Sequence, residues 1–424
     1  MEPVVRLDGS HFVSCPVDEY EALLARKVAR LRILVECACG RVGLPEVEVF
    51  ESPKSHFRMR ANFNIWLDRP PRREEGVAEE PLDWYYAMFD PTVEGGKKRP
   101  VCEIKTFPRG TVFLNTLMDS VRCVLKKPEF AVLSKLLFEV RFVCTKTEQA
   151  VIVLLYHRPL VENWAELATK ALDEINPDKS KHIVKLIGRS NKVKVVVGGE
   201  DDIIEEKLTV TQEGRFRDVF LYQTEGAFSQ PNAAVCEKML NWVLDITASP
   251  SWRERDLLEL YCGGGTFTVV LCDNFRSVLA TEISKASVLL AERCFKRNEK
   301  TNVKVARMSS EEFELAMSTT SGREFRRLAE KSIDVRKDFD FGTVFVDPPR
   351  AGLDPATCKL LTSFDNIIYI SCNPETLARD IDIILKTGMF SVQRLAAFDQ
   401  FPYTEHLEGG VFLTKTKKRK AKEE

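Results

Sequence analysis

The sequence predicts an α/β protein whose C-terminal region, residues 226–416, folds as a doubly wound sheet, preceded by an α+β domain over 1–225. Two observations carry this prediction. From about residue 226, short apolar runs alternate with helical stretches, a pattern typical of a parallel sheet with helices on both faces. Before that point, strand-like runs follow one another with few helices between them. The length of 424 residues allows two or three domains with real cores.

The N-terminal region opens with a helical stretch, "DEYEALLARKVARLRILVECACG", which ends at a glycine in the C-cap position. The run "HFRMRANFNIW" (56–66) then alternates like a strand, with one apolar and one polar face. A charged, proline-bearing stretch near 68–100 predicts a surface insert. The runs "LLFEVRFVCT" and "QAVIVLLYHRPL" predict further strands. The apolar face of the alternating run holds Phe57, Met59, Ala61, Phe63 and Ile65, and the polar face holds Arg58, Arg60, Asn62 and Asn64.

The C-terminal region contains seven strand-like runs, most of them separated by helical stretches. A second charged insert falls near 316–338, and the basic tail 417–424 is expected to be disordered. The seven runs are "DLLEL", "SVLATEI", "VKVAR", "FGTVFVDPP", "NIIYISC", "VQRLAAF" and "GGVFLTK".

Composition excludes several classes of protein. Hydrophobic residues make up 44% and charged residues 29%, as in ordinary soluble domains. The net charge of −1 gives no global attraction to nucleic acid, so any polyanion site must be a local patch. The twelve cysteines form no paired zinc pattern, and there is neither a signal peptide nor an 18-residue apolar run. We therefore expect no metal, no membrane association and free thiols in the cytoplasm, with the nucleus left open by the basic tail.

A glycine-rich turn follows the first strand of this region, in "LLELYCGGGTFTVVL" (257–271). Its glycines, Gly263–Gly265, let a ligand approach the backbone, and the helix that follows favours polar or anionic groups. Thr268 occupies the third glycine position of a dinucleotide fingerprint, which is therefore incomplete. The next strand ends on Glu282, whose carboxylate can accept both hydroxyls of a ribose. Together these features predict a nucleoside cofactor; the alternative is a plain turn beside a surface glutamate.

The segment "TVFVDPPRAGLD" (343–354) ends a strand on Asp347. Asp-Pro-Pro at a strand end is typical of S-adenosylmethionine enzymes that act on bases. In enzymes that methylate exocyclic amines an aromatic residue follows the prolines, whereas Arg350 stands there in this chain. This favours methylation at carbon, which needs a nucleophile because uracil C5 is barely reactive. A thiolate that adds to C6 turns C5 into an enolate carbon able to attack a methyl group.

A candidate nucleophile lies at the tip of the next strand, in "NIIYISCNPETLARD" (366–380). A free cysteine is usually a small buried hydrophobe, but Cys372 precedes a good N-cap, Asn373, and a proline suited to the first helical position. A helix N-terminus beside the sulfur should favour thiolate. The loop "DQFPYTEHLEGGVFL" (399–413) offers His406 and Glu408, and a carboxylate in a closed pocket can act as the base for the C5 proton.

Taken together, these motifs resemble the tRNA (uracil-5-)-methyltransferase family. The resemblance covers nearly the whole chain apart from the two charged inserts and the tail. It implies a class I (Rossmann-like) methyltransferase domain that uses S-adenosylmethionine, and an N-terminal domain that binds RNA. The segments that carry it are "SPKSHFRMRANFNIW", "LLYHRPL", "LIGRS", "FSQPN", "LLELYCGGG", "LATEISK", "FVDPPRAGL", "YISCNPETLARD" and "FDQFPYTEHLE".

By this resemblance Cys372 is the nucleophile and Glu408 the base. Two positions depart from the family: Thr266 stands where Asn is frequent, and Gly409 replaces a bulkier residue. The implied cofactor contacts are Gln230, Tyr261, Thr266, Glu282 and Asp347, and the implied RNA contacts are Arg58, Arg60, Phe107 and Arg350.

The family methylates uridine 54 of the tRNA T-loop. Related enzymes of ribosomal RNA often carry an extra β-barrel and an iron–sulfur cysteine cluster, and neither pattern occurs in this sequence. The resemblance therefore favours tRNA as the partner of a monomeric enzyme. Two alternatives stay open: a methyltransferase of base amino groups, disfavoured by Arg350 and Cys372, and a non-catalytic RNA-binding or RNA-folding protein, disfavoured by the Cys372–Glu408 pair.

Overall fold

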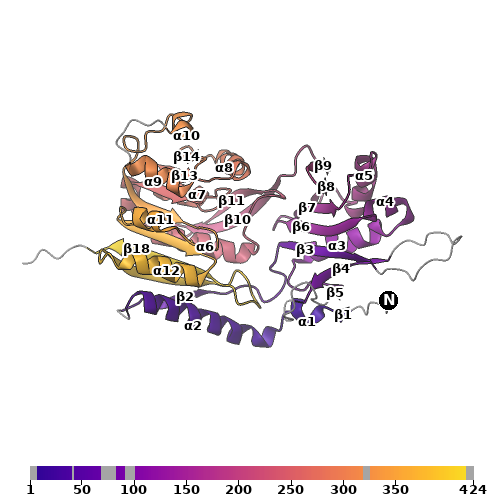
Figure 1. Ribbon diagram of the computed structural model, residues 1–424, viewed down its shortest axis with the longest axis horizontal. Helices are drawn as coiled ribbons and strands as arrows, with labels where there is room; N and C mark the ends of the chain where they lie inside the picture. Colours follow the sequence, from indigo (N-terminus) through magenta and orange to yellow (C-terminus); the bar gives the residue numbers. More distant parts are fainter. Residues whose placement is uncertain (1–6, 41–42, 68–82, 91–100, 319–324, 417–424) are drawn as a thin grey trace, which may run out of the picture. The chain divides into compact units, whose positions relative to one another are not determined.

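A computed structural model describes residues 7–40, 43–67, 83–90, 101–318 and 325–416, and the chain forms two compact units (Figure 1). The division differs from the expected single boundary at residue 225. Helix α2 (Tyr20–Ala38) and strand β2 (Val47–Phe50) come early in the chain but belong to the unit that holds the C-terminal region. Unit 1 comprises Met1–Pro16, Pro53–Glu206 and Gln223–Glu225, and unit 2 comprises Val17–Ser52, Lys207–Tyr222 and Gly226–Glu424.

Unit 2 is built on an eight-stranded sheet with the order β14-β13-β12-β15-β16-β18-β17-β2. From β14 to β16 the neighbouring strands are parallel, whereas β18 runs antiparallel to both β16 and β17. All seven predicted strands are present. Their bounds are β12 (Asp256–Leu260), β13 (Val278–Thr281), β14 (Val303–Ala306), β15 (Phe341–Val346), β16 (Asn366–Ser371), β17 (Phe390–Phe398) and β18 (Glu408–Lys415).

Helices cover both faces of this sheet, which confirms the doubly wound α/β fold (Figure 1). Leu258 and Leu260 of β12 point into a core shared with α2 and with four later helices. On the opposite face Trp242 packs against Phe398 with ring centroids 5.6 Å apart. The four helices are α9 (Ser310–Ser318), α10 (Arg326–Ala329), α11 (Pro355–Leu361) and α12 (Pro374–Leu385); unit 2 also holds α6 (Ala233–Ile246), α7 (Thr268–Leu271) and α8 (Lys285–Arg297).

Unit 1 contains a second eight-stranded sheet with the order β1-β5-β4-β3-β6-β7-β8-β9. Its predicted alternating strand is confirmed, since the five apolar residues from Phe57 to Ile65 are all buried. Ala61, Phe63 and Ile65 pack in a core with α3 (Val112–Leu125), α4 (Ala131–Ser134) and α5 (Trp164–Ile175). The remaining elements are β1 (Leu7–Asp8), α1 (Ser10–Val13), β3 (Arg60–Leu67), β4 (Trp84–Phe89), β5 (Val101–Glu103), β6 (Leu137–Cys144), β7 (Gln149–Tyr156), β8 (Ile183–Ser190) and β9 (Val193–Val197).

The expected surface insert over 68–100 needs correction at its centre. Its described part, 83–90, contains β4, which pairs with β3 and β5 inside the sheet. Trp84 and Tyr86 are almost fully buried there. A six-residue aromatic strand was hidden by its charged flanks; the rest of that insert and the basic tail lie outside the described residues.

The second insert, near 316–338, holds the end of α9 and all of α10. Strands β10 (Ile204–Gln212) and β11 (Arg215–Gln223) form a separate two-stranded sheet. All twelve cysteines are free thiols. Within the described ranges, no helix is both long and apolar enough to cross a membrane, and no three potential metal-ligating side chains gather.

Candidate active site

Five predicted site residues reach one edge of the unit 2 sheet. Because β12, β13, β15 and β16 are parallel and in register, their carboxyl ends meet at that edge. The antiparallel β18 begins at the same edge. The residues that follow or open these strands are Tyr261, Glu282, Asp347, Cys372 and Glu408.

The glycine turn after β12 has an unusual backbone. Tyr261 has φ +61°, a left-handed conformation that is uncommon for a residue with a bulky side chain. Its hydroxyl lies 2.7 Å from Oγ of Ser310, which fixes the ring. A Cβ built on Gly263 would meet no atom within 4 Å, so the space above this turn is open to a ligand. At Gly265, by contrast, a Cβ would lie 2.7 Å from the ring of Phe295.

Glu282, just after β13, is hydrogen-bonded to the glycine turn that follows β12. Its Oε2 accepts a hydrogen bond from the backbone N–H of Gly263 (3.0 Å), and its Oε1 accepts one from Ser284 (2.7 Å). Each carboxylate oxygen has a second lone pair, so the group can still accept ribose hydroxyls. The open turn and this half-buried acceptor fit the nucleoside half of S-adenosylmethionine.

Gln230 precedes α6, and its Oε1 accepts a hydrogen bond from Nε2 of Gln400 (3.0 Å). Gln400 is almost fully buried just beyond the end of β17. Its own Oε1 has no hydrogen-bond partner in the described part of the chain, so this amide pair keeps one unused acceptor. Thr266 is half-buried in the glycine turn.

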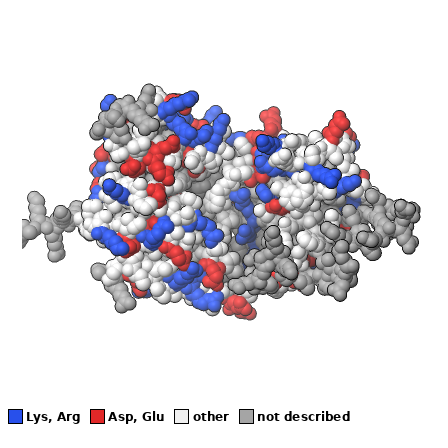
Figure 2. Space-filling view, in the orientation of Figure 1, with Lys and Arg blue, Asp and Glu red and all other residues white. Residues whose placement is uncertain are grey.

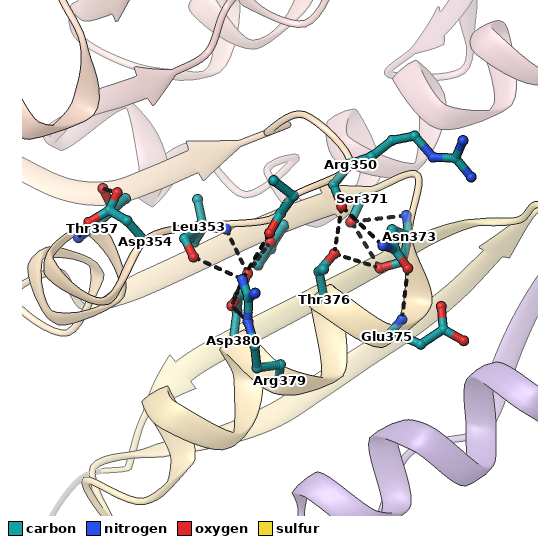
Figure 3. A network of polar contacts seen from close by, with 12 residues as sticks. Arg350, Leu353, Asp354, Thr357, Ser371, Asn373, Glu375, Thr376, Arg379 and Asp380 are labelled. Atoms are coloured by element: carbon teal, nitrogen blue, oxygen red, sulfur yellow. Dashed lines mark hydrogen bonds and ion pairs between the residues drawn. The ribbon is translucent and has the colours of Figure 1, made fainter.

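The loop after Asp347 is anchored from below by a buried carboxylate (Figure 3). Asp380 of α12 accepts hydrogen bonds from the backbone N–H of Leu353 and the hydroxyl of Tyr369, both 2.8 Å long. A Cβ on Gly352 would lie 2.6 Å from the same carboxylate, and φ there is +74°, so this position needs glycine. The Asp-Pro-Pro turn is therefore held by contacts to the next strand and helix.

The start of α12 confirms the predicted cap. The Asn373 side chain accepts from the backbone N–H of Glu375 (3.2 Å) and donates to the carbonyl of Arg350 (3.0 Å). Figure 3 shows the Arg350 guanidinium extending away from these contacts. Its Nη2 lies 2.8 Å from Nδ1 of His406. The cap thus connects the segment that holds Cys372 to Arg350, the residue after the two prolines.

The structure does not show the expected activation of Cys372. Burial, together with the carboxyl groups of Glu408 and Asp347, raises the pKa of the Cys372 thiol to about 12, although Arg350 acts in the opposite direction. The thiol is therefore protonated at neutral pH. The partial positive charge of one helix terminus is outweighed by loss of water and by two acidic neighbours.

Two carboxyl groups beside the sulfur also favour their neutral forms. Glu408 is 3% exposed, and its Oε2 has no hydrogen-bond partner among the described residues. Burial, and then the nearby Asp347, raise the pKa of Glu408 well above its usual range. Burial likewise raises the pKa of Asp347. Removed from water and close together, the two groups cannot ionise independently.

A third carboxyl group in this cluster was missed by sequence reasoning. Glu259 lies in the middle of β12 and is 1% exposed. Burial raises its pKa to about 8, and the carboxyl of Asp347 adds to the shift. The available signal was a glutamate in an otherwise apolar central strand, "DLLEL", where an ionised side chain is rare.

The predicted RNA contacts divide between the units. In unit 1, Arg58 and Arg60 are half-buried beside the polar face of β3. Burial, then the charge of Arg109 and that of Arg60, lower the pKa of Arg58. Burial, then the charge of Arg141, lower the pKa of Arg60. We call Arg58, Arg60, Arg109 and Arg141 the arginine row, because their like charges act on one another. Carboxylates offset part of this charge, since Arg141 is paired with Glu139 and Glu225. Glu225 also acts on the pKa of Arg60 in the opposite direction.

Phe107 also belongs to unit 1, but its ring is 3% exposed and packs edge-on against Phe63 at 5.4 Å. In this conformation it is a core residue. Arg350 belongs to unit 2. On the face shown in Figure 2, basic and acidic side chains are interspersed, in line with the net charge of −1. The arginine row is thus a local feature of an otherwise balanced surface.

Comparisons with known proteins agree along nearly the whole chain. The family model described as tRNA (Uracil-5-)-methyltransferase matches residues 19–416. The tRNA/tmRNA (uracil-C(5))-methyltransferase of Ectopseudomonas mendocina is 45% identical over 404 residues, which cover 95% of this chain and 99% of the relative. The enzyme of the same name from Cellvibrio japonicus is 45% identical over 395 residues, 93% of this chain and 95% of the relative.

A solved structure shares the fold. It is the Pyrococcus abyssi tRNA (uracil-54, C5)-methyltransferase in complex with S-adenosyl-L-homocysteine, with a TM-score of 0.60 and 19% identity. The match covers 96% of this chain and 86% of that chain. At this identity the likeness supports the fold assignment alone.

Proposed function

This chain belongs to the tRNA (uracil-5-)-methyltransferase family, and from that premise we propose that it methylates C5 of uridine 54 in the tRNA T-loop through a covalent bond between Cys372 and C6. The observation that carries the mechanism is the ladder between β16 and β18. The ladder ends at the pair Ser371 and Gly409, so continuing the register by one residue sets Cys372 opposite Glu408. A nucleophile and a buried carboxyl group are thereby held side by side.

The chemistry assigns one role to each side chain. The Cys372 thiolate adds to C6, and the electron pair of the C5–C6 double bond moves onto C5 and its conjugated carbonyl. S-adenosylmethionine, when bound, supplies an electrophilic methyl group on a sulfonium and leaves as a neutral thioether. Glu408 then removes the proton from the methylated C5, the double bond reforms, and the Cys372 thiolate is expelled. Every bond formed to the enzyme is broken again.

The electrostatics of the site support a cationic cofactor. Burial and neighbouring carboxyl groups raise the pKa of the Cys372 thiol and of Glu408, and burial raises the pKa of Asp347. A cationic cofactor held at this site would lower the pKa of each of these groups, because a positive charge favours their anions. The residues that would hold the cofactor are Gln230, Tyr261, Thr266, Glu282 and Asp347.

For the RNA side we propose phosphate contacts by Arg58 and Arg60 of unit 1 and an RNA contact by Arg350 of unit 2. Phe107 is buried in the core of unit 1 and is not part of this proposal. A uridine that is internally paired in the T-loop must be flipped out to reach Cys372, which costs a few kcal/mol. Phosphate contacts give no sequence information but set the register of the RNA on the protein. We further propose that the enzyme acts as a monomer in the cytoplasm.

The test is a trapping experiment with tRNA that contains 5-fluorouridine. Fluorine cannot leave C5 as a cation, so the wild-type protein with S-adenosylmethionine should accumulate a covalent RNA–protein complex visible on a denaturing gel. Cys372→Ala should form none, and Glu408→Gln should trap an adduct on unsubstituted tRNA. Absence of a complex with wild type, or an equal amount with Cys372→Ala, overturns the mechanism. Mapping 5-methyluridine in the product tests position 54 separately.

A further inference from the structure

A lysine is buried where α2 meets the loop that precedes Glu408. Lys27 is 4% exposed, and its Nζ forms an ion pair with Asp399, which is 1% exposed. The same Nζ donates to the backbone carbonyls of Phe401 (3.2 Å) and His406 (3.0 Å). An ammonium group has three donors, so each finds an acceptor.

The three acceptors span the loop that carries the proposed base. This loop connects Phe398, the last residue of β17, to Glu408, the first residue of β18, and these two residues are paired. Lys27 therefore binds the loop at its first and third residues and again two residues before Glu408. Other contacts also hold this loop. Thr404 Oγ1 donates to the carbonyl of Phe401 (2.8 Å), and the ring of Tyr403 lies 5.9 Å from that of Tyr20. Among the described residues, however, only Lys27 is seen to bind the loop at three of its residues through one atom.

The same helix also reaches the segment that carries the proposed nucleophile. Arg30 forms an ion pair with Glu375 in the first turn of α12, three residues after Cys372. Leu31 lines the space beside Gly409, where a Cβ would lie 3.2 Å from its Cδ1. Residues three and four apart share one face of a helix, so this face of α2 spans both catalytic segments.

A purely structural role explains these observations poorly. Replacing a buried ion pair with apolar residues of similar volume is often neutral or stabilising, so the pair is weak evidence for a contribution to stability. What an apolar substitute cannot supply is a donor to two loop carbonyls together with a fixed charge. These contacts show that Lys27 sets the backbone path of the loop before Glu408.

We propose that Lys27 is a positioning residue for Glu408, which holds the base loop so that the Glu408 carboxyl faces the C5 proton of the methylated adduct. This inference rests on the proposed function, since it assigns Lys27 a role through Glu408. Lys27 touches no reacting atom. Its loss should spare the addition of Cys372 to C6 and slow the later elimination.

The variant that tests this is Lys27→Met, with Arg26→Ala as the matched control. Arg26 is the neighbouring residue of α2, and its pair with Glu405 is exposed and 3.8 Å long. For Lys27→Met we expect kcat to fall about 100-fold, since a misplacement of about 1 Å has that effect on catalysis. The KM for tRNA should change by less than about threefold, because RNA binding is not touched. Arg26→Ala should match the wild type.

The diagnostic readout is the covalent adduct. On unsubstituted tRNA, Lys27→Met should accumulate adduct, as Glu408→Gln does, while its complex with 5-fluorouridine tRNA forms at the wild-type rate. Equal losses in complex formation and turnover, or wild-type behaviour in both, overturn the inference. If Lys27→Met does not fold, Lys27→Met/Asp399→Leu removes the stranded carboxylate and must show the same accumulation, or the inference is wrong. A wild-type protein that forms no fluorouridine complex refutes the proposed function instead.

Discussion

Ser371 and Gly409 are paired across the antiparallel strands β16 and β18, one residue before the proposed nucleophile and one residue after the proposed base. The hydrogen-bonded ladder between β16 and β18 thus sets the distance between the backbones of Cys372 and Glu408. A ladder is stiffer than a loop because every backbone group in it is fixed by a partner. The fold therefore supplies part of the alignment that covalent catalysis needs.

Gly409 allows the close packing behind this pair. A Cβ built there would lie 2.7 Å from Cδ2 of Leu377 and 3.2 Å from Cδ1 of Leu31, so the space of the bulkier family residue is filled by two leucines. We expect Gly409→Val to lower the free energy of unfolding by about 1–3 kcal/mol, as overpacking does. Urea unfolding measures this change.

Two further variants sharpen that measurement. Gly226→Ala is the control, because a Cβ at Gly226 would meet no atom within 4 Å. Leu31→Ala should cost less stability in the Gly409→Val protein than in the wild type, since the added valine fills part of the space that Leu31 leaves. A Gly409→Val protein as stable as the wild type would contradict the packing account.

Local sequence patterns predicted most of the fold of unit 2. Each strand from β12 to β18 shows apolar runs bounded by turn residues, and the polar residues at their ends mark the site edge, so Glu282, Asp347 and Cys372 could be placed from the sequence. Strand β4 was missed because its six residues lie between charged flanks. Lys27 was missed because only the tertiary pairing of α2 with the base loop gives it a role.

The state of Cys372 was predicted wrongly for a related reason. The helix N-terminus that follows it is visible in the sequence. What opposes ionisation is burial of the sulfur in the fold, and then the carboxyl groups of Glu408 in β18 and of Asp347 just after β15. Charge effects between distant segments depend on distances that a sequence does not contain. The helix N-terminus, which favours the thiolate, is a local feature, whereas the effects that favour the thiol depend on the tertiary structure.

Alkylation of the ligand-free protein tests the state of the thiol. Because its pKa is raised to about 12, Cys372 should react with iodoacetamide slowly at pH 8, and the rate should rise about tenfold per pH unit up to at least pH 10. Peptide mass spectrometry can follow Cys372 beside the exposed Cys37 as an internal reference. Saturating S-adenosylmethionine should accelerate the alkylation of Cys372, because the positive charge of its sulfonium favours the thiolate. A rate that levels off near pH 7 would show that the thiol is already activated.

Glu259 should make folding stability depend on pH. Its folded pKa of about 8 lies above the ordinary glutamate value of 4.5, so the folded protein binds a proton that the unfolded chain releases. Stability from this group is fully present below pH 4.5 and is lost as pH rises towards 8. The change is about 1.4 kcal/mol per pH unit within that window.

Glu259→Gln removes this dependence while keeping the side-chain volume. Relative to the wild type, the variant should therefore gain stability progressively between pH 5 and pH 8, measured by urea unfolding at several pH values. Exposed Glu299→Gln serves as the control and should show no such trend. A constant difference between Glu259→Gln and the wild type across this range would show that Glu259 ionises normally.

The arginine row should contribute to RNA affinity through phosphate. Arg58→Ala and Arg60→Ala should each weaken tRNA binding, and each should reduce the slope of log affinity against log salt by about 1. Lys170→Ala is the control in the same unit, because Lys170 is exposed and paired with Glu166 on α5. Filter binding at several salt concentrations gives both quantities. Unchanged affinity and slope in both arginine variants would remove them from the interface.

Glu282 should govern cofactor affinity and leave RNA binding untouched. Its carboxylate accepts a hydrogen bond from Gly263 in the glycine turn and can also accept the ribose hydroxyls. Glu282→Ala therefore removes an acceptor for the ribose and a hydrogen bond that holds the turn. A hydrogen bond to a charged group is worth about 1.5–3 kcal/mol, so affinity for S-adenosylmethionine should fall roughly ten- to a hundredfold. Calorimetry measures this loss, with Glu299→Ala as an exposed control. tRNA binding should stay near the wild-type value, because the arginine row lies in the other unit. A folded Glu282→Ala protein with unchanged cofactor affinity would mean that the turn binds its ligand without this carboxylate.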